Sequence, residues 1–183
     1  MDENVIVSPT LDFTGLADMT SRQPGYSSAD YDGDGIVEIP VVTPFLGYFQ
    51  SGSAAEYMTS WLAYYPDLDI FVLESSTYYN TAVGYVFKLP NRWLNLVTVV
   101  RDDASRVVSF ARYDNELEEV EDMPGLISLA AVSPDNEEAY LNDGYSYLSG
   151  DGFITFMTKN LAPDGEPLLL TQDEVKSNIY RLY

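Results

Sequence analysis

Two runs of β-branched and aromatic residues, separated by a short turn, constrain the fold of this chain more than any other feature. LVTVV at 96–100 and RVVSFARY at 106–113 lie on either side of DDAS at 102–105. β-Branched side chains favour extended backbone, whereas Asp and Ser favour turns because their side chains bond to nearby backbone N–H groups. Residues 94–113 are therefore predicted to form an antiparallel hairpin.

Similar β-rich runs recur along the chain, with turn residues between them. Further strands are predicted in a hairpin over 68–89 broken around Asn80, in GLISLAAV at 125–132, and in FITFMT at 153–158 after a turn at 149–152. Residues 53–65 begin with a match to a helical capping box, Ser53 and Glu56, but YMTSWLAYY favours a strand. The pattern is typical of an α+β protein built mainly from antiparallel sheet.

A helix is predicted at the end of the chain, over residues 171–182. Thr171 is a favoured N-cap residue, and Glu174 three positions later completes a capping box. Apolar residues then recur at i, i+4 and i+7 and form one stripe that can pack on the sheet: Val175, Ile179 and Leu182.

The chain is long enough to bury a substantial core. Its 183 residues are 46% hydrophobic, and a chain of this length buries about 70% of its unfolded surface.

A change in composition near residue 75 indicates an approximate boundary between two parts of the chain. Residues 1–75 are predicted to be a β-rich segment and residues 76–183 an antiparallel α+β domain. The acidic runs at 116–122 and 135–138 are predicted to be solvated loops or helix surface.

Charge narrows the range of partners. The 9 Lys and Arg residues against 29 Asp and Glu residues give a net charge of −20. This charge repels phosphate backbones and anionic lipid headgroups, so no nucleic acid partner is expected. The first twenty residues have neither the basic nor the continuous apolar region of a signal peptide, and no run approaches about 18 apolar residues. Direct membrane insertion by this chain is therefore not expected.

The absence of Cys and His removes most familiar catalytic chemistry. Zinc sites of the Cys/His type, Ser-His-Asp triads and Cys-His dyads all need one of these residues. No motif of a nucleotide-binding loop or serine hydrolase is present either. We therefore predict that the protein is not an enzyme. The alternative is a carbohydrate-active or other carboxylate-dependent hydrolase, which needs two acids about 5–9 Å apart that spacing alone does not identify.

Residues 30–38, DYDGDGIVE, carry the one pattern with specific chemistry. Carboxylates at relative positions 1, 3, 5 and 9, with glycines at 4 and 6, have the spacing of a calcium loop. The predicted Ca²⁺ ligands are Asp30, Asp32, Asp34, the backbone carbonyl of Ile36, and Glu38. The alternative is a solvated acidic turn, because Asp and Gly are ordinary turn residues.

Two departures from an EF-hand follow the loop. Relative position 12 is Val41 rather than a bidentate Glu, and Pro40 interrupts any following helix. We therefore expect flanking strands and a weak affinity, about 10⁻⁴ to 10⁻³ M, as in extracellular calcium modules. The expected role of the ion is to stabilise the fold.

The stretch SADYDGDGIVEI at 28–39 resembles the calcium loop of FG-GAP and VCBS-type β-propeller blades, in which such a loop bridges two strands. The Phe-Gly and Gly-Ala-Pro signatures of those blades are absent, and the motif occurs once. The resemblance implies that residues 1–75 are a terminal propeller blade or a piece of a larger protein.

Residues 76–183 carry a second resemblance. GYVFKLPNRW at 84–93, followed by the predicted hairpin, GLISLAAV and LTQDEVKSNI, is similar to secreted lipoprotein domains of Gram-positive bacteria. Some of these have a PsbP-like α/β/α sandwich, generally without an enzymatic active site. The resemblance implies an extracellular or cell-surface protein, with a lipidated Cys and signal peptide upstream of this chain.

Aromatic residues suggest a binding role. The chain has 15 Tyr, 8 Phe and 2 Trp, and the adjacent rings of Tyr64-Tyr65 and Tyr78-Tyr79 lie on opposite faces of an extended strand. Most aromatic rings are expected in the core, but one ring of each pair can be exposed. The sequence thus predicts a calcium-stabilised accessory or binding module with a glycan or protein ligand.

Overall fold

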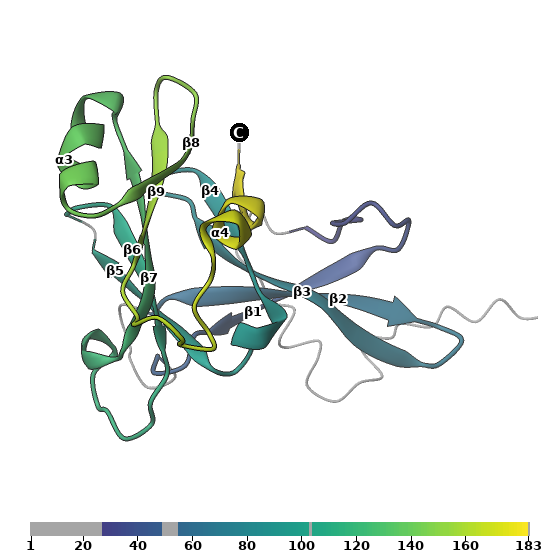
Figure 1. The fold of residues 1–183 in the computed structure, drawn as a ribbon. Helices are drawn as coiled ribbons and strands as arrows, with labels where there is room; N and C mark the ends of the chain where they lie inside the picture. Colours follow the sequence, from purple (N-terminus) through teal and green to yellow (C-terminus); the bar gives the residue numbers. More distant parts are fainter. Residues whose placement is uncertain (1–26, 49–54, 103, 183) are drawn as a thin grey trace, which may run out of the picture.

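The computed structural model describes residues 27–48, 55–102 and 104–182, which form two five-stranded antiparallel sheets (Figure 1). Sheet A has the order β1 (Glu38–Pro44), β2 (Tyr57–Tyr65), β3 (Ile70–Asn80), β4 (Tyr85–Leu89) and β10 (Ile179–Arg181). Sheet B has the order β5 (Val97–Asp102), β6 (Val107–Arg112), β7 (Gly125–Val132), β9 (Thr155–Asn160) and β8 (Ser146–Gly150). The predicted class, mainly antiparallel sheet with a C-terminal helix, is confirmed.

Helical structure in the described residues is short. The α-helices are α3 (Glu137–Asn142) and α4 (Gln172–Asn178), and the single 3₁₀ turns are η1 (Asn91–Trp93), η2 (Val120–Asp122) and η3 (Pro134–Asn136). No helix in these parts of the chain is long and apolar enough to span a membrane. Of the acidic run at 116–122, residues 116–119 form an exposed loop and the rest forms η2, in which Val120 is buried and the acidic residues are exposed. The run at 135–138 lies on η3 and the start of α3.

The two sheets share one aromatic core. Phe87 of β4 and Phe110 of β6 have ring centroids 5.1 Å apart, and Trp93 of η1 lies 5.3 Å from Phe110. The indole Nε1 of Trp93 donates a hydrogen bond to the Leu168 carbonyl at 2.6 Å. Trp93 therefore joins both sheets to the segment that leads into α4.

The sequence of β7 is almost entirely apolar because this strand is buried on both of its faces. It lies in the middle of sheet B, and every residue after Gly125 is buried. One of its faces packs into the shared core, and the other packs against Tyr145, which follows α3. A polar side chain on such a strand needs a hydrogen-bond partner inside the protein. For Ser128 of β7 this partner is the Tyr145 hydroxyl, which lies 3.0 Å from Ser128 Oγ.

Most predicted strands are confirmed, with one correction. The hairpins over 68–89 and 94–113 appear as β3–β4 and β5–β6, and YMTSWLAYY forms β2. The strand predicted over 153–158 instead spans Thr155–Asn160, and residues 146–150 form the additional strand β8. The turn lies later than expected because Asp151 Oδ1 accepts hydrogen bonds from the backbone N–H groups of Phe153 and Ile154, both at 2.9 Å.

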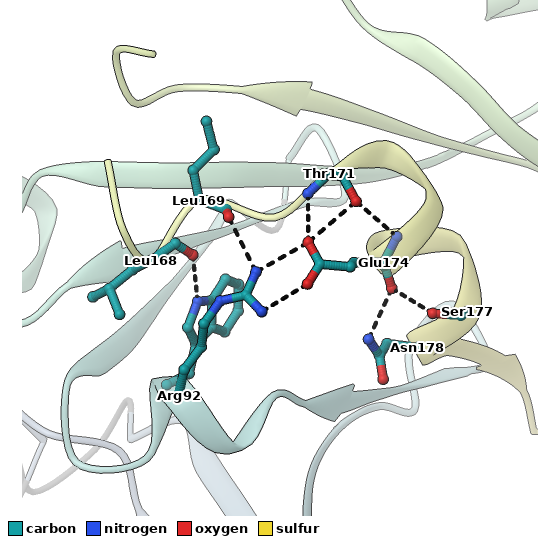
Figure 2. Close-up of polar contacts among 8 residues, drawn as sticks. Arg92, Leu168, Leu169, Thr171, Glu174, Ser177 and Asn178 are labelled. Atoms are coloured by element: carbon teal, nitrogen blue, oxygen red, sulfur yellow. Dashed lines mark hydrogen bonds and ion pairs between the residues drawn. The ribbon is translucent and has the colours of Figure 1, made fainter. Parts of the chain in front are cut away.

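The C-terminal helix is shorter than its apolar spacing predicts. The capping box of Thr171 and Glu174 is present, and Val175 is buried as expected. The helix ends at Asn178, whose side chain donates to the Glu174 carbonyl at 2.8 Å (Figure 2). Ile179 then pairs with Phe87 in the strand β10, which adds hydrogen bonds along β4. Continuing the helix to Leu182 was the wrong prediction because this strand pairing satisfies the backbone instead.

β1 is the first strand of sheet A. The N–H and C=O of Glu38 bond to Ala29 rather than to β2, at 2.9 and 3.2 Å. Pro40 and Pro44, two and six residues later on the same strand, have their backbone nitrogens on that same outer side.

The predicted boundary near residue 75 falls inside β3, and sheet A joins strands from both sides of it. Residues 1–26 and 49–54 of the predicted first segment, Ser53 among them, lie outside the described residues.

A bidentate ion pair fastens the first turn of α4 to η1. Figure 2 shows the Arg92 guanidinium beside the Glu174 carboxylate, with donor–acceptor distances of 2.6 and 3.0 Å. Arg92 also donates to the Leu169 carbonyl at 3.1 Å. The hydrogen bonds from Arg92, then those from Thr171, lower the pKa of Glu174 from 4.5 to about 2.

The depressed pKa of Glu174 predicts an acid-dependent loss of stability. The ionised Glu174 carboxylate makes its full contribution to the free energy of unfolding above the unfolded pKa of 4.5. This contribution should be lost as the pH falls from there towards about 2. Because both side chains are more than a third exposed, solvent screening limits it to about 1 kcal/mol. Urea unfolding at a series of pH values measures this. Glu174→Gln keeps a capping-box acceptor and removes the charge, so a pH profile unchanged by this variant would contradict the prediction.

Candidate metal centre

The acidic loop of residues 30–37 is held shut at its base by two backbone hydrogen bonds. Ala29 and Glu38 form an antiparallel bridge, with N–H to O distances of 3.2 and 2.9 Å. β1 begins at Glu38 and pairs with β2, so the loop is attached directly to sheet A. The predicted flanking strand is therefore present after the loop, as β1, whereas before the loop only the single bridge residue Ala29 is paired.

Within the loop, the carboxylates also organise the backbone. Asp30 accepts hydrogen bonds from the N–H groups of Gly33 and Gly35, at 2.7 and 3.1 Å. Both glycines have positive φ, 82° and 91°. This left-handed region is open to Gly and strained for most other residues, which accounts for glycine at both positions.

Three of the predicted ligands converge. One carboxylate oxygen from each of Asp30, Asp32 and Glu38 lies within 4.8 Å of the other two. Two oxygens that each lie about 2.4 Å from a calcium ion are at most about 4.8 Å apart, so this spacing fits one shared cation. Asp34 is outside this group, and its Oδ1 accepts the Ile36 N–H at 2.7 Å. The Ile36 carbonyl stays a predicted ligand.

Glu38 differs from the other acids in its burial. It is only 1% exposed, whereas Asp30 and Asp32 lie in solvent. Its Oε2 accepts the Tyr31 N–H at 2.6 Å, but its Oε1 is buried and has no hydrogen-bond partner among the described residues. Burying an unpaired carboxylate oxygen is costly, and a cation between Glu38 and the two Asp side chains would remove that cost.

The side chain of Tyr31 attaches the loop to sheet A. Its ring stacks on Trp61 of β2 with centroids 4.5 Å apart and planes 15° from parallel. Burial, and then the nearby hydroxyls of Tyr79 and Tyr180, raise the pKa of Tyr31 to about 12. The spacing of acidic residues did not predict this contact. An aromatic residue between two aspartates was the only local signal for it.

The negative charge of the loop reaches the neighbouring strand. The phenol of Tyr65 in β2 has a raised pKa, first because it donates a hydrogen bond to Glu74 at 2.9 Å, and further because of Asp34 and Asp32. A cation bound in the loop would offset the field that these aspartates create.

The hydrolase alternative needs a pair of acids with different environments, and two further sets of acids lie outside the loop. Glu56 is largely buried and is already paired, with Arg101 at 3.1 Å and the Tyr78 hydroxyl at 3.0 Å. Asp102 and Asp143 line a hollow of about 470 Å³ beside α3. Hydrogen bonds from Ser105 and its turn lower the pKa of Asp102, which is the opposite of what a general acid requires.

Comparisons with known proteins add no evidence on the candidate site, which is therefore interpreted from its own geometry. No protein-family model matches the chain, and no curated protein or solved structure matches it either.

Proposed function

We propose that this chain is a calcium-stabilised, non-enzymatic accessory or binding module of a bacterial cell-surface or secreted protein. The observation that supports it best is the unpaired, buried Oε1 of Glu38, in a carboxylate that is grouped with those of Asp30 and Asp32. Hard divalent cations prefer several carboxylate and carbonyl oxygens, and the loop offers these without any Cys or His. The ion would fasten the loop to β1 and β2.

The proposed location follows from the same site. A loop without the bidentate position-12 ligand belongs to the class with dissociation constants of about 10⁻⁴ to 10⁻³ M, which occurs in extracellular modules. The resemblance of residues 76–183 to secreted lipoprotein domains agrees with this location. The finer assignments, a propeller-type loop for residues 30–38 and a PsbP-like sandwich for the C-terminal part, are proposals of the same kind.

The binding role is supported by exposed aromatic residues on β8, on β10 and in the turn before β9. Tyr147 of β8 and Tyr180 of β10 are about half exposed, and Phe153, in the turn before β9, is 82% exposed. The ion pair of Asp151 with Arg181 joins this hairpin to β10. Exposed rings of this kind contact glycans and protein partners, and we propose one of these as the ligand.

Calcium should raise the melting temperature of the protein by several degrees. Calcium at 10 mM is about 10 to 100 times the expected dissociation constant of about 10⁻⁴ to 10⁻³ M, so it should stabilise the folded state by about 1.4–2.7 kcal/mol. For a chain of this size, this is a shift of roughly 3–10 °C. The measurement is a thermal melt in EDTA and in 10 mM calcium, for the wild type and for Asp32→Asn.

The matched control is Asp164→Asn, which makes the same chemical change at an exposed position outside the loop. This variant should keep the full response to calcium, and Asp32→Asn should lose most of it. Identical wild-type melts with and without calcium would overturn the proposed metal site.

A further inference from the structure

We propose that metal binding in the loop controls access to the outer face of sheet A. With the metal bound, Tyr31 covers Trp61, and when the metal is released, the loop moves away and this aromatic surface is uncovered. The inference rests on the proposed function, because it needs the loop to bind calcium. It adds a consequence for a surface that is not part of the ligand set.

The first step is that Tyr31 and the metal ligands move as one unit. Tyr31 lies between Asp30 and Asp32 in the sequence, and its N–H bonds to the Oε2 of Glu38 at 2.6 Å. A metal held by these three carboxylates would fix the backbone on both sides of Tyr31. The stacked position of the ring is therefore linked to occupancy of the site.

The second step is that, without the metal, electrostatic repulsion and hydration favour opening of the loop. The carboxylates of Asp30, Asp32 and Glu38 lie within 4.8 Å of one another, and their like charges repel. Opening also lets water reach the unpaired Oε1 of Glu38. The stack on Trp61 and the hydrogen bonds to Asp30 oppose opening, so the two states compete and a cation can shift the balance between them.

The third step is that Trp61 keeps its place when Tyr31 leaves. Its Nε1 donates to Thr77 Oγ1 at 3.1 Å, and Thr77 in turn donates to the Thr59 carbonyl at 3.3 Å. These bonds lie within β2 and β3 and do not involve the loop. Met58 of β2 packs on the shared core, so Trp61, an odd number of residues later, is on the opposite face of the sheet.

The surface uncovered in this way would be larger than one ring. The hydroxyls of Tyr79 and Tyr180 lie close enough to Tyr31 to affect its pKa, and Tyr180 is already about half exposed. Removing Tyr31 would add the Trp61 face to these neighbours. The metal-free protein would then present an aromatic surface that the metal-bound protein conceals.

Acrylamide quenching of tryptophan fluorescence tests this directly. Trp61 is one of the two tryptophans, and the other, Trp93, is buried in the core. In EDTA, we expect quenching to increase several-fold with a red shift of emission, and calcium should reverse both changes. Trp61→Phe should lose the response while Trp93 stays protected in EDTA, which shows that the core is intact.

Tyr31→Ala separates the surface from the metal site. The hydrogen bond from Tyr31 to Glu38 comes from the backbone N–H, which alanine retains. This variant should therefore still bind calcium, measured by calorimetry, but Trp61 should be quenched equally with and without the metal. Calcium binding by the wild type with no change in its quenching would overturn this inference and leave the proposed function standing. No calcium binding at all would overturn both.

Discussion

Replacing Trp93 with alanine should lower the free energy of unfolding by about 3–5 kcal/mol, the range for large aromatic residues removed from a core. Trp93 is only 2% exposed and contacts Phe87 and Phe110, one from each sheet. The substitution would also leave the Leu168 carbonyl without its indole donor. Urea unfolding monitored by circular dichroism measures the change.

The matched variant is Trp93→Phe, which retains much of the ring contact and removes the hydrogen bond to Leu168. It should cost less than Trp93→Ala, because a single hydrogen bond contributes about 1 kcal/mol and the cavity is smaller. A loss below about 1 kcal/mol for Trp93→Ala would contradict the role assigned to this residue, since exposed sites rarely exceed about 0.5 kcal/mol.

Glu38→Gln should change stability in opposite directions with and without calcium. In EDTA the variant should be more stable than the wild type by about 1–3 kcal/mol, because a neutral amide costs less to bury than an unpaired carboxylate. The amide oxygen can still accept the Tyr31 N–H, which keeps the local backbone contact. At a calcium concentration 100 times the dissociation constant, the order should reverse wherever that advantage is below about 2.7 kcal/mol, because the variant loses metal-linked stabilisation of about this size.

Chemical denaturation of both proteins in EDTA and in calcium measures this reversal. Asp34→Asn is the control within the loop, because Asp34 lies outside the converging group and bonds to Ile36. It should have a smaller effect in calcium than Glu38→Gln. If Glu38→Gln destabilises the protein equally in both conditions, the buried carboxylate serves packing or hydrogen bonding rather than a cation.

Local signals predicted the elements whose stabilising contacts are local. The β5–β6 turn forms where Asp102 bonds to the N–H of Ala104 and to the Ser105 hydroxyl, a pattern readable within four residues. The capping box of Thr171 and Glu174 is equally local. β10 could not be predicted in the same way, because Ile179 is held in a strand by Phe87, which is far away in the sequence.

In the candidate site, too, local spacing predicted some of the residues, whereas a contact that depends on strand pairing was not predicted. Spacing alone selected Asp30, Asp32 and Glu38, because oxygens at these positions of a tight loop must lie close together. It also selected Asp34, whose carboxylate lies outside the converging group and accepts the Ile36 N–H. The stack of Tyr31 on Trp61 depends on the pairing of β1 with β2, so no pattern within the loop could specify it.

The outer side of β1 has a consequence for association between molecules. An open sheet edge offers a row of N–H and C=O groups on which a strand of another chain can polymerise. Here Ala29 occupies the groups of Glu38, and Pro40 and Pro44 supply no N–H donor on that side. Sheet A is thus blunted against intermolecular strand addition at β1, and the strong negative charge of the chain adds mutual repulsion between copies.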